Sequence, residues 1–487
     1  MLKKLPPPKY ANLSAIQQDL SAKKISVEAL VRHYLHQISA TQNLNIYIEV
    51  FEEEALKKAI ALDKRLSENP TTVGRLAGAV ISIKDVICFA QHKVSAASKI
   101  LENFTSVYTA SALQRLLDED AIIIGRTNCD QFAMGSANDN SFYGATHNAL
   151  DPDKVPGGSS GGAAVSIQAD TCLAALGSDT GGSVRQPAAF CGVVGMKPTY
   201  GRISRYGLLA YASSFDQIGT LTHSIDDAAL LLEIMSGSDD YDSTASMQPP
   251  VKYTDNAANN KLKIAYFDTA LNNAAMDDSI RNVTLQFIKQ LKTDGHSVEA
   301  MPFDLLNYII PAYYVLTTAE ASSNLSRYDG IRYGYRHEDA KNLEEVYTLS
   351  RTEGFSAEVK RRIMLGAFVL SSGYYDAYYT KAQKVRRLIQ EQTLSILEQY
   401  DFILTPASPI PAWNIGEKSD DPVAMYFADI FTVQANMTGL PAICFPIGKD
   451  KNGMPIGIQF MANKWQESEL FSFAKQYETY KIKNATD

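Results

Sequence analysis

Two glycine-rich clusters that contain serines are the part of the sequence best suited to nucleophilic chemistry. The first cluster, residues 157–162, holds Ser159 and Ser160, and the second, residues 181–183, ends at Ser183. Glycine costs backbone entropy and offers no side chain for packing, so its repeated use indicates a backbone that bends sharply or approaches another group closely. A serine hydroxyl held at such a turn could attack a carbonyl carbon once a base has removed its proton.

Residues 157–162 are open to three other interpretations. A flexible surface loop would also be rich in glycine and serine. A phosphate-binding loop requires a lysine directly after the glycines, and none follows here. The G-x-S-x-G pattern of a nucleophile elbow matches residues 157–161, but that elbow follows a buried strand, whereas residues 151–156 are polar and contain two prolines.

A serine nucleophile needs a base, which is most often a histidine. No histidine lies in a glycine-rich turn, although His223, close to Ser224 and Asp226, remains an alternative. The other option is a buried lysine, because burial disfavours the charged form and can lower a lysine pKa by several units. Lys84 directly follows the apolar run 77–83, so it is the lysine best placed for burial, unless its side chain extends to water.

These residues could form a proton relay in which Ser159 bridges the base Lys84 and the nucleophile Ser183. A helix over 161–169 would begin at the first cluster and a strand over 172–176 would lead to the second, which returns the two serines to one place. The backbone N–H groups of the second turn would then face the developing oxyanion, at about 3 kcal/mol per donor. The predicted oxyanion donors are Thr180, Gly181, Gly182 and Ser183.

The elements that must position these residues alternate between strand and helix patterns, which favours a mostly parallel sheet covered by helices. Residues 11–69 are helical, with Ser26 as a helix cap, and residues 199–222 are rich in loops. The expected strands are 77–83, 121–124, 172–176, 263–267, 402–405, 442–445 and 457–461. The expected helices beyond residue 69 are 111–118, 161–169, 226–235, 280–293 and 380–400.

Composition limits the kind of protein. The chain has 487 residues, 45% hydrophobic and 21% charged, with a net charge of −8, which is ordinary for a soluble protein with a large core. Neither a signal peptide nor a membrane span of roughly 18 apolar residues is recognisable. Five scattered cysteines give neither a disulfide framework nor metal spacing and indicate a reducing compartment. We expect a cytoplasmic protein without a metal site.

The signature G-G-S-S-G-G at 157–162, followed by G-S-D-T-G-G-S-V-R-Q-P-A-A-F-C-G-V-V-G-M-K-P-T-Y-G-R at 177–202, resembles the amidase signature family. The spacings of 75 and 24 positions agree with the Ser-cisSer-Lys triad of that family. The resemblance implies Ser183 as the acyl-forming nucleophile, Ser159 as the bridging serine after a cis peptide, and Lys84 as the base. It also implies an α/β fold with a large mixed β-sheet core covered by helices on both faces.

The helical pattern predicts an N-terminal helical layer, residues 1–70, and the resemblance implies that residues 71–487 form an amidase signature domain. The signature core covers about 75–225, and a polar stretch at about 239–260, with two prolines, is expected to be a loop.

Residues 130–136, 319–330, 373–379 and 421–441 resemble one branch of the family, the glutaminase subunits of tRNA-dependent amidotransferases. The resemblance implies that glutamine is hydrolysed and that its ammonia reaches a partner subunit, which converts Glu-tRNA(Gln) to Gln-tRNA(Gln). It implies a heterotrimer completed by the B and C subunits of the amidotransferase, no cofactor on this chain, and ATP and Mg used by the complex through the partner subunit.

The same resemblance assigns substrate-binding residues. Arg362 would clamp the α-carboxylate of glutamine and Asp429 would take the α-ammonium, with Arg361 as a rival to Arg362. Without the resemblance, a solvated helix face would be the preferred interpretation of Arg362. The further expected substrate contacts are Met134, Gly135, Ser136, Tyr313 and Tyr314, and the residues expected to support the site from behind are Asp179 and Arg185.

Three departures from the family pattern are visible: Gln131 replaces a usual Glu, Ala163 a common Ser, and Q-A-N-M-T at 434–438 a more familiar P-V-N-L-A.

Two alternative functions stay open. One is a stand-alone amidase that acts on a hydrophobic amide. The other is a non-catalytic assembly subunit for tRNA, against which the acidic net charge argues.

Overall fold

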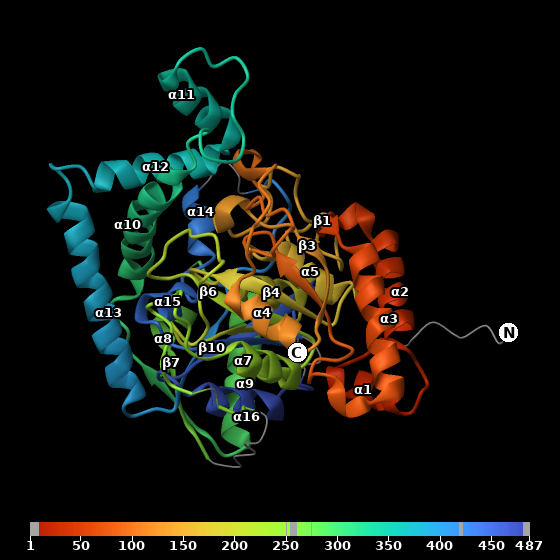
Figure 1. Ribbon diagram of the computed structural model, residues 1–487. Coiled ribbons are helices and arrows are strands. Elements are labelled where there is room, and N and C mark those ends of the chain that lie inside the picture. The colour runs from red at the N-terminus through yellow and green to blue at the C-terminus, as the bar shows by residue number, and fades with distance from the viewer. Residues whose placement is uncertain (1–8, 250, 254–260, 274, 418–421, 481–487) are drawn as a thin grey trace.

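The computed structural model describes residues 9–249, 251–253, 261–273, 275–417 and 422–480, which form a large mixed sheet with helices on both faces (Figure 1). The strands are β1 (Tyr47–Val50), β2 (Val80–Lys84), β3 (Ile122–Thr127), β4 (Ala174–Asp179), β5 (Val194–Lys197), β6 (Gln217–Thr222), β7 (Lys263–Phe267), β8 (Ser297–Met301), β9 (Phe402–Pro406), β10 (Ala442–Lys449) and β11 (Pro455–Met461). The α-helices are α1 (Leu13–Ser21), α2 (Val27–Ala40), α3 (Glu52–Glu68), α4 (Ser111–Asp118), α5 (Gly161–Gln168), α6 (Arg185–Cys191), α7 (Ile225–Met235), α8 (Asp268–Leu271), α9 (Asp278–Thr293), α10 (Leu306–Asn324), α11 (Leu343–Gly354), α12 (Ala357–Val369), α13 (Lys381–Leu397), α14 (Pro422–Phe427), α15 (Val433–Thr438) and α16 (Glu467–Gln476). A π-helical turn, Asp376–Thr380, leads into α13.

The described strands lie in the order β1-β3-β2-β4-β6-β5-β10-β11-β9-β7-β8. Parallel pairs join β3, β2 and β4 near one end and β9, β7 and β8 at the other. Between them, β4, β6, β5, β10, β11 and β9 pair antiparallel. The expected mixed sheet is confirmed, but the mostly parallel pattern inferred from alternation is wrong. Short connections, such as the hairpin between β10 and β11, can only join antiparallel strands.

Several predicted elements match closely, and others were missed. Ser26 caps α2, its side chain accepting a hydrogen bond from the N–H of Ala29 at 3.1 Å, and α4 and β7 have the predicted bounds. Strand β6 lies inside the stretch expected to be rich in loops. Its residues are all buried, including the polar Gln217, Thr220 and Thr222, so their polarity gave a false loop signal.

The N-terminal segment contributes α1, α2 and α3 along one side of the molecule and the edge strand β1, which pairs with β3 (Figure 1). The division at residue 70 stays a prediction. The expected polar loop at 239–260 contains neither helix nor strand in its described part, and residues 250 and 254–260 lie outside the described residues. Within the described ranges no helix has the length and apolar character needed to cross a membrane.

Helix α5 lies at the centre of the fold and fixes the first glycine cluster. Its residues from Gly161 to Ile167 are all buried, and it contacts β2, β4 and α6. A Cβ atom at Gly162 would lie 2.4 Å from the carbonyl oxygen of Asn128, so only glycine allows this approach. The small residues of α5 thus hold the preceding serines against the ends of β2 and β4.

Candidate active site

Lys84 is the last residue of β2, and its side chain is fully buried. Its Nζ donates hydrogen bonds to three serine hydroxyls: Ser159 at 2.6 Å, Ser160 at 3.0 Å and Ser178 at 2.9 Å. The alternative in which this lysine extends to water is therefore wrong. Three hydroxyls satisfy the three N–H donors of an ammonium, and a neutral amine in the same place could accept a proton from one of them.

Burial lowers the pKa of Lys84 to about 8, although the carboxylates of Asp130 and Asp179 oppose the shift. The cause is desolvation, which penalises the charged ammonium more than the neutral amine. About a tenth of Lys84 is thus uncharged at pH 7, and the uncharged fraction that a general base requires grows as the pH rises through about 8.

The two glycine clusters meet through their backbones. The N–H of Ser160 donates to the carbonyl oxygen of Ser183 at 3.1 Å, and the N–H of Asp130 donates to that of Ser159 at 3.2 Å. The peptide bond between Gly158 and Ser159 is cis, as the resemblance implied. Lys84 and Ser159 are fully buried, whereas Ser183 is 8% exposed. The Ser159–Ser183 step of the relay remains a prediction.

The turn after β4 is shaped by Asp179 and a positive backbone angle. Asp179 accepts hydrogen bonds from the N–H groups of Gly182 at 2.9 Å and Val184 at 3.1 Å. Gly182 has φ +124°, and a Cβ there would lie 2.1 Å from Thr432 Oγ1. Because its N–H is already used, Gly182 leaves the predicted set of oxyanion donors. The donors that remain are Thr180, Gly181 and Ser183.

Arg185 supports this turn from behind as the centre of a buried polar network. Its Nε and Nη2 donate to the two carboxylate oxygens of Asp179 at 3.0 and 2.8 Å. Burial would raise the pKa of Asp179, but the guanidinium outweighs burial and holds that pKa well below its usual range. Arg185 also donates to Asn436 Oδ1, the Thr432 carbonyl oxygen and Gln459.

Arg362 lies on the inner face of α12 and is buried. Its Nε donates to Glu358 Oε1 at 2.8 Å and its Nη1 to Tyr211 Oη at 2.7 Å, but its buried Nη2 has no partner among the described residues. The guanidinium carbon lies 5.1–5.6 Å from the ring centroids of Tyr211, Tyr314 and Tyr426. This aromatic cage leaves one nitrogen free to bind an anion.

Arg361 does not share this environment. Its side chain is about half exposed and pairs with Glu358 from the outside of the helix. The solvated-face interpretation therefore fits Arg361 and fails for Arg362.

Asp429 is the matching buried anion. Its Oδ2 accepts a hydrogen bond from the Ser136 hydroxyl, whereas its buried Oδ1 has no partner among the described residues. Burial raises the pKa of Asp429 to about 7, although the Ser136 hydrogen bond and the charge of Arg362 oppose the shift. A carboxylate of this kind gains a charged partner readily, because an ammonium restores the stabilisation that burial removes.

Aromatic side chains close the space between these groups. A Cβ at Gly181 would lie 2.5 Å from Tyr313 Oη, so Tyr313 packs directly against the predicted oxyanion turn. Tyr314 stacks on Tyr426 with ring centroids 3.8 Å apart. Both predicted tyrosines are buried. Tyr211, Tyr426 and Glu358 were not anticipated, although Glu358 stands one helical turn before Arg362, a spacing typical of ion pairs.

Met134 and Gly135 lie in the buried segment beside the first glycine cluster. A Cβ at Gly135 would lie 2.4 Å from the carboxyl group of Asp130, and one at Gly158 would lie 2.1 Å from the same group. Asp130 thus fills the space between two segments expected in the site. Burial raises its pKa to about 7, and its role was not anticipated from the sequence.

The departures from the family pattern keep key contacts. Gln131 Oε1 accepts a hydrogen bond from the N–H of Ser356, the cap of α12, as a carboxylate oxygen could. Asn436 Nδ2 donates to Asp179 Oδ1 at 3.0 Å, so the altered segment 434–438 still supports the turn. Ala163 is buried within α5.

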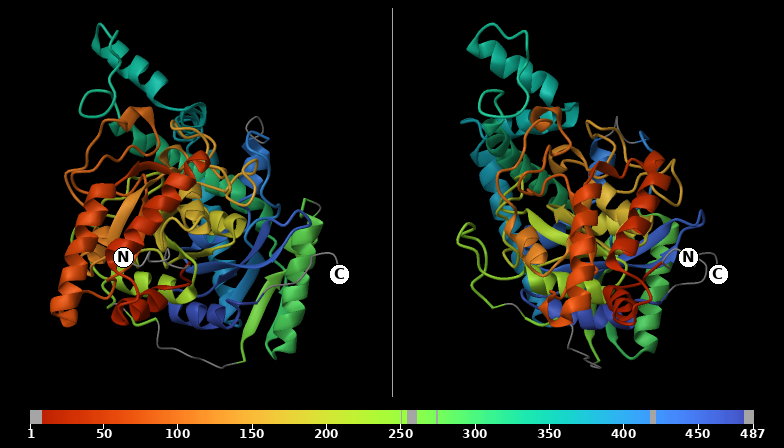
Figure 2. Two further views of the ribbon diagram at one scale, coloured as in Figure 1. Left: turned by 90° about the vertical axis from the view of Figure 1, so that its right-hand side faces the viewer. Right: turned by 45° about the vertical axis from the view of Figure 1, so that its right-hand side comes forward.

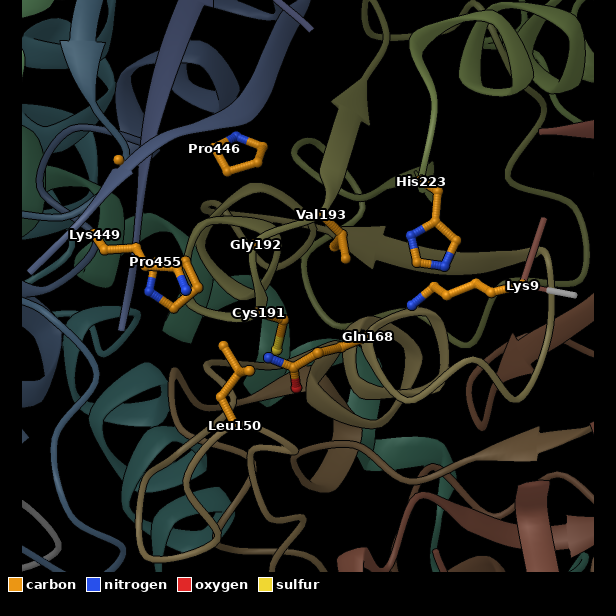
Figure 3. A pocket seen from close by; sticks show the side chains of 11 residues that line it. Lys9, Leu150, Gln168, Cys191, Gly192, Val193, His223, Pro446, Lys449 and Pro455 are labelled. Atoms are coloured by element: carbon orange, nitrogen blue, oxygen red, sulfur yellow. The ribbon is translucent and has the colours of Figure 1, made fainter. Parts of the chain in front are cut away.

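A separate cavity of about 430 Å³ contains His223 (Figure 3). Lys9, Gln168 and Lys449 also line it, and none of the three triad residues does. Burial lowers the pKa of His223 to about 4. Because His223 lines a cavity that none of the triad residues lines, the structure does not place it with the predicted nucleophile and argues against the histidine alternative.

The fold and this site define an amidase, and the chain belongs to the amidase family, whose model matches residues 29–471. The resemblance and the fold class expected from the sequence are thereby confirmed. A relative from Chlorobium luteolum is 48% identical over 96% of each chain, and one from Chlorobium limicola is 49% identical over 94% of this chain and 97% of its own. Both are named as the A subunit of glutamyl-tRNA(Gln) amidotransferase.

Solved structures agree with this assignment. The crystal structure of the glutamyl-tRNA(Gln) amidotransferase A subunit from Thermotoga maritima is 37% identical, with a TM-score of 0.78 over 95% of this chain and 93% of that one. The native peptide amidase from Stenotrophomonas maltophilia is 27% identical, with a TM-score of 0.80 over 96% of both chains. The shared fold therefore includes an amidotransferase component as well as an amidase of another kind.

Arg185→Met should destabilise the protein strongly. It leaves the buried Asp179 without its bidentate partner, and breaking a buried ion pair in this way costs about 3–5 kcal/mol. The free energy of unfolding from urea titration measures the effect. Arg387→Met, which breaks an exposed pair with Glu391, is the matched control and should cost less than about 1 kcal/mol. Equal losses in the two variants would contradict the structural importance of the buried pair.

Proposed function

We propose that this chain is the glutaminase subunit of a Glu-tRNA(Gln) amidotransferase, in which it hydrolyses glutamine and supplies ammonia to a partner subunit. The observation that carries the proposal is a pair of buried atoms, Arg362 Nη2 and Asp429 Oδ1, that have no hydrogen-bond partner among the described residues. A free amino acid such as glutamine carries the carboxylate and the ammonium that satisfy these two atoms. Nearly full-length relatives named as this component of the enzyme support the same assignment.

The proposed reaction begins with proton transfer. Neutral Lys84 takes the proton of Ser159, which in turn takes the proton of Ser183, so that Ser183 Oγ attacks the side-chain amide carbon of glutamine. The N–H groups of Thr180, Gly181 and Ser183 stabilise the oxyanion. Ammonia leaves with a proton returned through Ser159, and water then hydrolyses the acyl-enzyme to glutamate.

The released ammonia is used elsewhere in the proposed complex. A partner subunit transfers it to Glu-tRNA(Gln), and the complex is a cytoplasmic heterotrimer of this chain with the B and C subunits. ATP and Mg are consumed through the partner subunit, and this chain holds no cofactor of its own. Formation of an acyl-enzyme between the isolated chain and a glutamine-derived electrophile would exclude a purely assembly role with tRNA.

A stand-alone amidase is the second candidate, favoured by the peptide amidase among the structural neighbours. It would not need charged groups for a free amino acid. Comparing the isolated chain on glutamine and on an aryl amide distinguishes the two candidates.

Ser183→Ala should abolish glutamine hydrolysis and glutamine-dependent amidation, because it removes the attacking oxygen. The assembled complex should keep wild-type amidation with free ammonium chloride, which bypasses this site. Product Gln-tRNA(Gln) is measured with each nitrogen source. If the ammonia-dependent activity disappears as well, Ser183 has a structural role instead.

The kcat/KM of glutamine hydrolysis should fall as the pH is lowered, with a midpoint near pH 8. Lys84 acts only when uncharged, and below its pKa of about 8 it holds a proton, so kcat/KM rises with pH through that value. Lys84→Met should abolish activity. The control is Lys197→Met, because burial lowers the pKa of Lys197 to about 7 and that lysine is not in the proposed relay. If the midpoint instead moves in the Lys197→Met variant, Lys197 and not Lys84 is the group that titrates.

Arg362→Ala should lower kcat/KM for glutamine about 10- to 100-fold, as expected when a charged hydrogen bond worth about 1.5–3 kcal/mol is lost. Hydrolysis of an aryl amide without a carboxylate should not change by more than about twofold if the chain accepts it. Arg361→Ala, on the exposed face of the same helix, is the matched control. Equal loss on both substrates would refute carboxylate recognition by Arg362.

A further inference from the structure

Six large apolar or aromatic side chains lie exposed together around the end of α12, and we call them the α12 patch. They are Met364, Leu365, Phe368, Tyr374, Tyr375 and Tyr378. Met364 is 72% exposed and the others are 41–45% exposed. Residues 371–378, which follow α12 and include the start of the π-helical turn, are all exposed. Clustered apolar exposure of this kind marks an interaction site.

The patch is organised before any partner binds. The ring of Phe368 packs against Tyr374 with centroids 4.3 Å apart and against Tyr378 at 5.6 Å. Tyr375 packs similarly against Tyr379 at 5.1 Å. Rings that hold one another lose little conformational entropy when a partner covers them.

Helix α12 connects the patch to the candidate active site. Its buried face carries Arg362, Gly366 and Val369, and its opposite face carries three patch residues, Met364, Leu365 and Phe368. A Cβ at Gly366 would lie 2.0 Å from the Thr318 carbonyl oxygen, so α12 is seated directly on α10. Figures 1 and 2 place α10, α12 and α13 together, on the side of the molecule away from α1–α3.

We propose that the α12 patch docks the B subunit, the partner that accepts the ammonia. The surface of the B subunit that covers the patch would be apolar, with acidic residues around its edge. This inference rests on the proposed function. The acidic edge is indicated by Lys381 and Lys384, which are exposed at the start of α13 and form no ion pair with any described residue. The choice of the B over the C subunit follows from α12 itself, because the helix whose outer face the partner covers carries Arg362 of the proposed glutamine site on its inner face.

Protein fits this surface better than RNA. Bases stack on aromatic faces that are free, whereas Phe368 and Tyr374 already cover each other, and Met364 and Leu365 offer no stacking face. Two lysines that form no ion pair with a described residue, on a chain of net charge −8, make a weak site for a phosphate backbone.

The first test is retention of the B subunit on the tagged full chain when all three proteins of the complex are co-expressed. Leu365→Glu combined with Phe368→Glu should reduce this retention at least tenfold, with an unchanged melting temperature and unchanged acyl-enzyme formation. Leu285→Glu, at a similarly exposed leucine on α9, should show wild-type retention. Lys384→Glu should weaken retention more at low salt than at high salt, as expected for a rim charge.

A second test does not depend on destabilising substitutions. Met364→Cys adds an exposed thiol to a chain whose five native cysteines are all buried, so a thiol-directed crosslinker reacts at this position. A crosslink to the B subunit in the assembled complex is expected. A crosslink to the C subunit alone, or none, would overturn the proposal.

The remaining outcomes are also decisive. Wild-type retention of the B subunit in the Leu365→Glu, Phe368→Glu variant overturns the patch and leaves the proposed function intact. Failure of the wild-type chain to retain either partner overturns both. An isolated chain that is dimeric until the double substitution makes it monomeric, or that loses tRNA binding with the same substitution, shows that a second copy or RNA occupies the patch instead.

Discussion

The burial of one amine, that of Lys84, is the constraint on which the rest of the site depends. In water this amine would be almost fully charged at neutral pH, because an unperturbed lysine has a pKa of about 10.4. Enclosed by the hydroxyls of Ser159, Ser160 and Ser178, it keeps hydrogen-bond partners but loses the solvation that favours its charge. The close packing of α5 and the end of β2 serve this enclosure.

The buried carboxylates of the candidate site fall into two groups. Asp179 keeps its charge because Arg185 binds both of its oxygens, and the charged carboxylate can then hold the N–H groups of the turn. Asp130 and Asp429 have no such bidentate partner among the described residues, and burial raises the pKa of each to about 7. A protonated Asp130 no longer stabilises the ammonium of Lys84, so the raised pKa of Asp130 weakens this opposition to a neutral base only below about pH 7.

Much of this arrangement could be predicted from the sequence, because the local hydrophobic pattern and the positions of the glycines determine it. Lys84 at the end of an apolar run and the two glycine clusters indicated the relay, and α4 and β7 followed from hydrophobic periodicity. Tertiary packing decides the rest. The polar β6 is a strand only because neighbours cover it. Arg361 and Arg362 are indistinguishable in sequence, and they differ in burial only because α12 rests on α10 with Arg362 facing inward.

The two faces of α12 give a physical reason why a glutaminase of this kind would work beside its acceptor. Free ammonia is protonated and lost in bulk water, so its release is useful only where a partner is seated close by. The helix that carries Arg362, the residue proposed to bind the substrate carboxylate, is also the helix that presents Leu365 and Phe368 to the outside. Because Gly366 lets α12 pack directly against α10, the two helices are in close contact. A partner bound to the outer face of α12 would therefore contact the same rigid helix that fixes the guanidinium of Arg362. Substrate recognition and partner binding would thus be carried by one helix, each on its own face.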